Sequence, residues 1–419
     1  MKKTRRYLTL IAGALLLTAC SNDEAQTDDS GYKPSSDAIG FDANTAGPFT
    51  RSVTGEIGDD DALRNLTFAN HYPSASTEKR GFGVFASYTG AVTYENSTVS
   101  PNFMYNQQVK YNTTNTSWEY DPVKYWPNQT SDRVSFFAYA PYEPAPTDDG
   151  RCIIGASDKN DLGDPWINYR LSRDPWGTGT TYEPQVDLMY GFNNTTPTAQ
   201  KPWTDQRKSD YGVNDKLAFT FNHALGCFAN EVTLQLSDEL RTLLTGYSTI
   251  KINSLTITYN NLTNKARLVL NPNISVGNTF ANWKEIISGE LTTSRTTGAI
   301  TKYPTVNSGD LLSTVDFLSA ASPVKISEDR GLLYIPIVIA GQPKPTATVT
   351  INYTITVTAG GADFTGDATA NIDMTQYHAP AYEGKRTALA LTLSKDLDLL
   401  HLVYILGGTA TDPSYSPKR

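Results

Sequence analysis

The stretch ATVTINYTITV, residues 347–357, decides the fold of this chain. In it every odd-numbered residue is apolar and every even-numbered residue is Thr or Asn. Successive side chains of a β-strand point to opposite faces of the sheet, so this strict period of two predicts a strand between a core and water. We expect one face of that strand to be buried, namely Ala347, Val349, Ile351, Tyr353, Ile355 and Val357.

The same period of two recurs along the chain, which predicts an all-β protein. Further examples are residues 82–88, 134–140, 217–221 and 255–259. Signals for helices are weak in comparison. Ser237 is expected to cap a short helix that ends at Gly246, with three leucines pointing inward. These are Leu240, Leu243 and Leu244.

The length of the chain exceeds what one hydrophobic core usually serves. It predicts two β-sandwich domains in tandem, each with about seven strands. Prolines interrupt residues 143–215 and strands resume after them, so the boundary is expected within about 20 residues of residue 213. The predicted domains are residues 38–213 and residues 214–419.

Residues 1–20, MKKTRRYLTLIAGALLLTAC, have the organisation of a secretory signal. Four basic residues precede an apolar run from Leu8 to Leu17, which is too short to span a bilayer. The end of this segment resembles a bacterial lipobox, and the resemblance implies that residues 1–19 are removed and that Cys20 is acylated. Residues 20–37 are polar and are expected to form a flexible linker. The chain is therefore expected to leave the cytoplasm and to be held at a membrane by lipid.

The charge of the chain argues against nucleic-acid binding. Removal of residues 1–19 takes away four basic residues, so the formal net charge falls from −8 to about −12, and phosphate backbones would be repelled. The four histidines have no zinc-site spacing and the sequence has no GxSxG motif, so we expect no catalysis, no metal and no cofactor. Cys152 and Cys227 lie in different predicted domains, so no disulfide is expected between them. Residues 59–61, three aspartates, are interpreted as a solvated turn.

Several local signatures occur in an order that resembles the fimbrillin family of Bacteroides-type anaerobes, whose members build pili from lipoproteins. They are WEY at 118–120, KYWP at 124–127, VSFFAYAPY at 134–142, VDLMY at 186–190 and LAFTFNHAL at 217–225. The resemblance is good from about residue 38 to residue 270 and extends less securely through LLYIP at 332–336.

The resemblance implies two transthyretin-like, Greek-key sandwiches and a role as a subunit of a surface fimbria anchored in the outer membrane. In this family a trypsin-like protease cuts after a basic residue beyond the first strand, and the groove so opened accepts a strand from the next subunit. The physical basis is sound, because a lost strand leaves unpaired N–H and C=O groups above an apolar trench, and a donated strand repairs both.

The first strand maps best to residues 38–43 and the cut to the bond after Arg51. Arg64 and Lys33 are weaker candidates for the cut, and Arg51 as a solvated loop charge is the alternative. The candidate donor is residues 397–406, LDLLHLVYIL, because it is apolar on both faces. A buried last strand would explain that composition equally well, and the polar tail after residue 406 departs from the family pattern. The candidate donor residues are Leu397, Leu399, Leu400, Leu402, Val403 and Ile405.

Three classes of function are considered, of which an uncharacterised hydrolase on a β-sandwich is the least favoured. The leading hypothesis is a structural or adhesive fimbrial subunit, either stalk or tip, whose partners are other fimbrial subunits and ligands on host or bacterial surfaces. The alternative is a monomeric glycan-binding surface lipoprotein, in which aromatic loop residues stack on sugar rings. Trp166, Trp176 and Trp203 would supply that platform.

Overall fold

The computed structural model describes residues 37–46, 57–72, 76–146, 151–172, 185–193, 203–212, 214–275, 278–286, 294–301, 315–319, 323–328 and 331–406. Several residues singled out from the sequence lie outside these ranges. They are Cys20, Lys33, Arg51, Trp176, the signal segment, most of the linker and the tail after Leu406. Across the described ranges, no helix is both long and apolar enough to cross a membrane.

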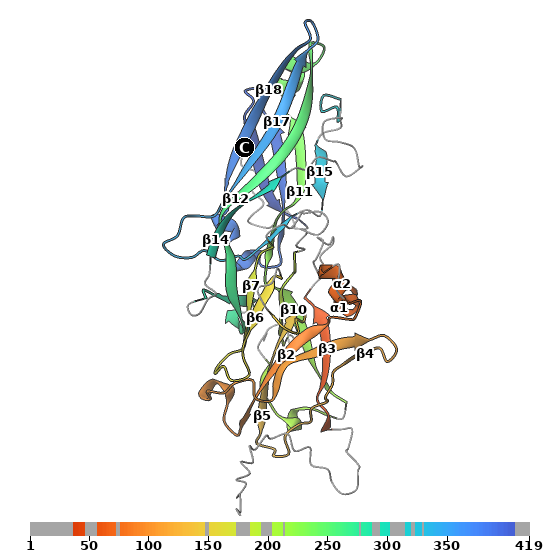
Figure 1. Ribbon diagram of the computed structural model, residues 1–419, viewed down its shortest axis with the longest axis vertical. Coiled ribbons are helices and arrows are strands. Elements are labelled where there is room, and N and C mark those ends of the chain that lie inside the picture. The colour runs from red at the N-terminus through yellow and green to blue at the C-terminus, as the bar shows by residue number, and fades with distance from the viewer. Residues whose placement is uncertain are drawn as a thin grey trace, which may run out of the picture.

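The described residues form three β-sheets with a few short helices, which confirms the all-β prediction. An eight-stranded sheet fills the lower half of Figure 1, with strand order β1-β10-β8-β5-β2-β3-β4 and β9 paired with β5. Its strands are β1 (Gly40–Thr45), β2 (Phe82–Gly90), β3 (Met104–Asn112), β4 (Ser117–Glu119), β5 (Arg133–Ala140), β8 (Met189–Phe192), β9 (Trp203–Gln206) and β10 (Lys216–His223). Helices α1 (Asp60–Asn65) and α2 (Phe68–His71) lie beside this sheet.

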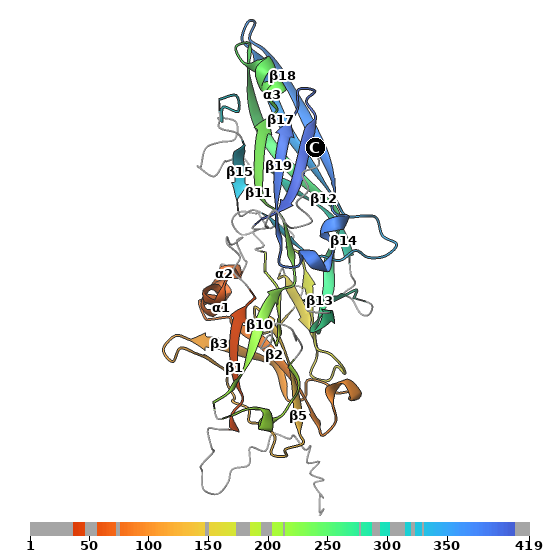
Figure 2. The same ribbon diagram turned by 180° about the vertical axis from the view of Figure 1, so that it is seen from behind.

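The other two sheets face each other in the upper half of the molecule (Figures 1 and 2). A five-stranded sheet has the order β15-β11-β19-β20, with β16 paired with β11. These strands are β11 (Gly226–Leu236), β15 (Val324–Glu328), β16 (Leu332–Tyr334), β19 (Arg386–Leu393) and β20 (Leu399–Ile405).

A seven-stranded sheet runs from this half down to the lower sheet, where β6 and β7 lie near β10 (Figure 1); its order is β18-β17-β12-β7-β6, with β13 and β14 paired with β12. Its strands are β6 (Ile153–Ala156), β7 (Trp166–Arg170), β12 (Ser248–Ser275), β13 (Asn278–Lys284), β14 (Ser294–Thr301), β17 (Thr346–Val357) and β18 (Ala362–Asp373). Helix α3 (Asp238–Leu244) lies at the end of this half that is distant from β1 (Figure 2).

Strand β17 has the alternation that its sequence predicts. Val349 and Ile351 are fully buried, and the Thr and Asn residues that alternate with the apolar residues of the strand point outward. Ile355 and Val357, however, are only half-buried, contrary to the expectation of a continuous buried face. Ile355 pairs with Phe364 of β18, whose side chain is 58% exposed, so the tip of this hairpin extends past the core.

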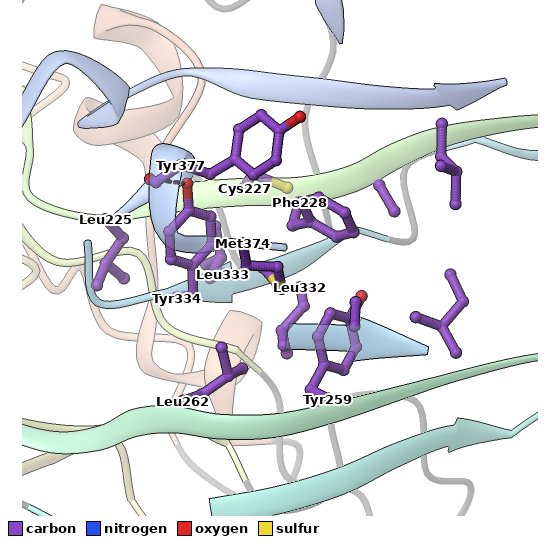
Figure 3. Packing of buried hydrophobic residues seen from close by; sticks show 14 of the residues in the cluster. Leu225, Cys227, Phe228, Tyr259, Leu262, Leu332, Leu333, Tyr334, Met374 and Tyr377 are labelled. Carbon is purple, nitrogen blue, oxygen red and sulfur yellow. Dashed lines mark hydrogen bonds between the residues drawn. The ribbon is translucent and has the colours of Figure 1, made fainter. Parts of the chain in front are cut away.

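The core of the upper half consists of aliphatic and aromatic side chains from both sheets (Figure 3), and the same apolar cluster continues into the lower sheet through Phe85, Phe137 and Tyr190. Phe228 of β11 meets Tyr259 of β12 edge-on, with ring centroids 6.0 Å apart. The buried Tyr334 hydroxyl donates a hydrogen bond of 2.7 Å to the carbonyl oxygen of Tyr377, so its polar atom is satisfied inside the core. The two facing sheets are therefore held by a continuous apolar layer.

Strand pairing crosses the expected boundary at residue 213. β10 lies beyond that residue and pairs with β1 and β8 of the lower sheet. β7 precedes residue 213 and pairs with β12 of the seven-stranded sheet. Hydrophobic periodicity is a local property and does not identify the partner of a strand, which explains why the sequence missed this exchange. The division into residues 38–213 and 214–419 and the Greek-key connectivity stay predictions.

The predicted short helix is present as α3, and the Ser237 hydroxyl accepts a hydrogen bond of 3.2 Å from the Leu240 amide. Leu240 and Leu244 are buried, as expected. Leu243 is 61% exposed, so its inward placement was wrong. Consecutive helical residues are about 100° apart, and this short helix contacts the core only along the edge that carries Leu240 and Leu244.

Truncation of Ile351 to Ala is expected to lower the free energy of unfolding by about 2–5 kcal/mol, because the residue is fully buried and its loss leaves a cavity. Thr350→Ala is the matched control, since its hydroxyl lies on the outer face, 3.4 Å from the Thr369 hydroxyl. Urea denaturation followed by circular dichroism measures both variants. Equal losses in the two would contradict the assignment of the inner face.

Candidate functional site

The first strand of the chain, β1, forms the candidate site. It runs over Gly40–Thr45, close to the predicted 38–43, and pairs in parallel with β10, so that Phe41 lies opposite Leu217. On its other side, the Ile39 amide donates to the Lys124 carbonyl at 2.9 Å and the Trp126 amide to the Asp37 carbonyl at 2.9 Å. The start of β1 is therefore held from both sides, by β10 and by residues 124–126.

The inward side of β1 covers the aromatic core of the lower sheet. Ile39, Phe41 and Ala43 are all less than 5% exposed. The ring of Phe41 lies 5.3 Å from that of Tyr120, 5.9 Å from that of Phe136 and 6.0 Å from that of Phe219, centroid to centroid. Loss of β1 would expose these rings and leave backbone groups of β10 unpaired.

Tyr120 also holds the backbone of β1. Its hydroxyl donates a hydrogen bond of 2.7 Å to the Ile39 carbonyl. Burial raises the pKa of Tyr120 well above its usual range, so the hydroxyl keeps its proton and stays a donor. This residue belongs to the WEY signature at 118–120, so that signature contributes one direct contact with the first strand.

The other end of β1 is held by α1. The Thr45 amide and the Thr45 hydroxyl both donate to Oδ1 of Asp60, at 2.6 Å and 2.9 Å. Asp59 caps α1 by accepting a hydrogen bond of 2.7 Å from the Ala62 amide. The interpretation of residues 59–61 as a turn was therefore wrong, because Asp59 caps α1 and Asp60 and Asp61 form its first turn. The signal was in the sequence, because an aspartate before an apolar helical pattern is typical of a helix N-cap.

The chain is fixed again at Ile57, the first described residue after β1 and Ala46. Ile57 is fully buried, and its amide donates to Oδ2 of Asp187 at 3.2 Å. Asp187 is itself paired with Nδ1 of His223 at 2.6 Å, and both side chains are buried. Residues 47–56, which include Arg51, join these two anchored points. Cleavage within them would separate β1 covalently from the remainder of the fold.

Of the weaker candidates for the cut, Lys33 lies outside the described residues, whereas Arg64 lies inside α1. Its guanidinium is 3.2 Å from Asp61 and stacks over the ring of Tyr111 at 5.4 Å. A protease needs an extended segment, so this placement disfavours Arg64.

The candidate donor residues form β20 and the turn before it. β20 pairs antiparallel with β19 and is the last strand at one side of its sheet. Leu399 is buried, whereas Leu400 is 57% exposed and Leu402 is 36% exposed. Leu397, Val403 and Ile405 are half-buried. Leu397 has a φ of +63°, a left-handed conformation that costs a leucine about 1 kcal/mol or more.

Of the three tryptophans of the predicted sugar platform, the structure describes Trp166 and Trp203, and both are engaged within the fold. Trp203 is buried, and its ring N–H donates to the Ala218 carbonyl at 3.2 Å. The ring of Trp166 is covered by the Arg267 guanidinium at 3.6 Å. Both residues therefore pack against the sheets, as loop and strand-end aromatics commonly do.

A buried ionic cluster near α2 was not foreseen from the sequence. Arg80 is fully buried and contacts Oε2 of Glu143 at 2.9 Å and Nδ1 of His71 at 2.7 Å. Arg151 reaches the other Glu143 oxygen at 2.6 Å. These contacts join α2 to the residues that precede β2 and follow β5. The members are far apart in the chain, so no local pattern indicates them.

Other reactive side chains do not assemble into a centre. Within the ranges that the structure describes, no three His, Cys, Asp or Glu side chains form a group able to hold a metal ion. Cys152 and Cys227 are buried and are not joined in a disulfide. The arrangement at β1 is a strand whose apolar side chains cover the aromatic core of the lower sheet.

The chain is similar to fimbrial proteins in both sequence and structure. A family model described as fimbrillin-like matches residues 69–405. The chain is 32% identical over 152 residues to the fimbrium subunit Fim1C of Phocaeicola vulgatus, a match that covers 36% of this chain and 36% of that relative.

Among solved structures, a fimbrial protein from Bacteroides vulgatus is similar with a TM-score of 0.58 and 20% identity, over 89% of this chain and 100% of the other. The fimbrial anchor protein Mfa2 from Porphyromonas gingivalis has a TM-score of 0.30 and 10% identity, over 88% of this chain and 97% of the other. The first of these likenesses extends over both halves of the fold.

Proposed function

The chain belongs to the fimbrillin-like family, and from that premise we propose that it is a structural subunit of a cell-surface fimbria, assembled by strand exchange after proteolysis. In this proposal the chain is exported as a lipoprotein with Cys20 acylated and is held in the outer membrane. A protease cuts after Arg51, β1 leaves its groove, and residues 397–406 of another subunit take its place. The role is structural and uses no cofactor.

The position of β1 carries this proposal. Three buried apolar side chains and the backbone hydrogen bonds with β10 and residues 124–126 hold the strand in place. Its covalent continuation runs through residues 47–56, so after a cut behind Arg51 noncovalent contacts alone join β1 to the remainder of the fold. A strand with the same alternation from another subunit could form equivalent contacts, so the exchange is close to balanced in free energy.

The position of β20 supports its role as the donor. It occupies the outermost place in its sheet and exposes Leu400 and Leu402, which are unusual side chains for an outer strand in water. Its partner β19 lies in the upper half of the molecule, whereas β1 lies in the lower half (Figure 2). Donation from one half to the other would join subunits head to tail, and repetition of such a heterologous contact produces an open filament.

Trypsin treatment of the mature chain tests this function. We expect the treated protein to form a ladder of higher-order species on size-exclusion chromatography and under electron microscopy, whereas the untreated protein remains monomeric. Treated protein that stays monomeric at high concentration would contradict a stalk subunit assembled by strand exchange.

A further inference from the structure

We propose that Asp60 is a positioning residue that retains β1 in its groove, so that cleavage and opening of the groove are separate steps. This inference rests on the proposed function, because it concerns the release of the strand that assembly requires. It predicts that the carboxylate of Asp60 sets how readily the cut end of β1 peels away.

The contacts at the end of β1 support this role. One oxygen of Asp60 accepts hydrogen bonds from both the amide and the hydroxyl of Thr45, the last residue of the strand. Hydrogen bonds to a charged acceptor are stronger than neutral ones. The next backbone contact toward the cut is the Ala46 amide, which donates to the Phe221 carbonyl at 2.9 Å. Among the described residues of β1, these three hydrogen bonds are the ones nearest the cut, so peeling from the cut end breaks them before the other contacts of the strand.

The carboxylate is held in place by structure other than β1. Leu63 of α1 is 1% exposed and packs into the aromatic core, and Asp59 caps the helix. The second oxygen of Asp60 lies 3.9 Å from the Arg64 guanidinium. Downstream, Ile57 is buried and hydrogen-bonded to Asp187. A cut after Arg51 leaves all of these contacts on the large fragment, so Asp60 still faces Thr45 after the cut.

Hydrogen–deuterium exchange of the uncut mature protein tests the proposal directly. In Asp60→Ala the peptide that covers residues 39–46 is expected to exchange about tenfold faster than in the wild type, because the loss of these bonds raises the population of the open end. Asp61→Ala is the matched control, since Asp61 is also in the first turn of α1, is 82% exposed in its side chain and pairs with Arg64. Equal exchange in the two variants would overturn the proposal.

Thr45→Val provides a second, independent variant that removes the hydroxyl hydrogen bond and keeps the β-branched shape. Its effect should be smaller than that of Asp60→Ala, and the double variant should be no faster than Asp60→Ala alone. Additive effects would show that the two residues act separately. Exchange of a peptide from β17 reports global unfolding. If that peptide also exchanges faster in Asp60→Ala, the variant has lost overall stability, and the exchange of residues 39–46 in Thr45→Val then tests the role of the Asp60–Thr45 contact.

The cut protein provides the link to assembly. After trypsin, the fragment of residues 20–51 is expected to leave Asp60→Ala about tenfold faster than Asp61→Ala, measured by mass spectrometry of the separated species. If the wild type is not cut after Arg51, the processing step of the proposed function fails, while the exchange experiment still decides the role of Asp60.

Discussion

Arg51→Ala is expected to abolish trypsin-triggered assembly completely while leaving a folded monomer. Without the cut, β1 remains covalently joined through residues 47–56 to Ile57, which is buried and anchored to Asp187. The occupied groove offers no unpaired backbone to a donor strand. Size-exclusion chromatography of the trypsin-treated variant should show a monomer, and circular dichroism should match that of the wild type.

The other two basic candidates provide the controls for this experiment. Lys33→Ala should assemble like the wild type, because Arg51 remains available. Arg64→Ala should also assemble, since Arg64 lies within α1 and is not an extended cleavage site. N-terminal sequencing of the assembled subunits should begin at Ser52. A different first residue, or assembly of Arg51→Ala, would show that the cut had been assigned to the wrong bond.

Deletion of residues 397–419 is expected to remove assembly entirely, while deletion of residues 407–419 alone should preserve it. The longer deletion removes β20, of which only Leu399 is buried, and leaves β11 and β19 paired with each other. The monomer should therefore stay folded, although it loses the cover that β20 provides to one side of β19. The shorter deletion removes only the polar tail.

Thermal unfolding and the trypsin assay together separate the two explanations of this apolar segment. A folded monomer that no longer polymerises supports a donor strand. Outright unfolding after the longer deletion means that residues 397–406 are needed as part of the sandwich itself, and the donor then has to lie elsewhere. Loss of assembly after the shorter deletion would place the donor in the tail.

Mixing experiments with these variants identify which partner is defective. The chain deleted after residue 396 keeps its groove, and Arg51→Ala keeps its donor strand. After trypsin treatment, the two together should form a one-to-one complex that neither forms alone, because one supplies an open groove and the other a strand. Absence of this complex would contradict the pairing of these two segments.

The physical basis of what the sequence predicted is local. The alternation in residues 347–357 and in the other period-two stretches determines which side chains lie on one face of a strand, and Val349 and Ile351 are buried accordingly. Ser237 caps α3 because a hydroxyl at that position satisfies a free helical amide. The family signatures are also local, and the WEY signature proved to contain Tyr120, which holds the first strand.

What only the tertiary structure decided is which of these local elements meet. Gly40 pairs with Lys216, Ile57 with Asp187, and Asp60 with Thr45. The hydrophobic periodicity of the sequence does not indicate any of these pairs, because a strand can satisfy its hydrogen bonds with any partner that shape and packing allow. For the same reason, the sequence did not indicate that β7 pairs with β12 or that β10 pairs with β1. Residue type and spacing were sufficient to predict an all-β fold and the inner face of β17 from Ala347 to Tyr353, but not that Ile355 and Val357 lie beyond the core. The groove around β1 and the carboxylate at its end exist only once segments far apart in the chain have packed together.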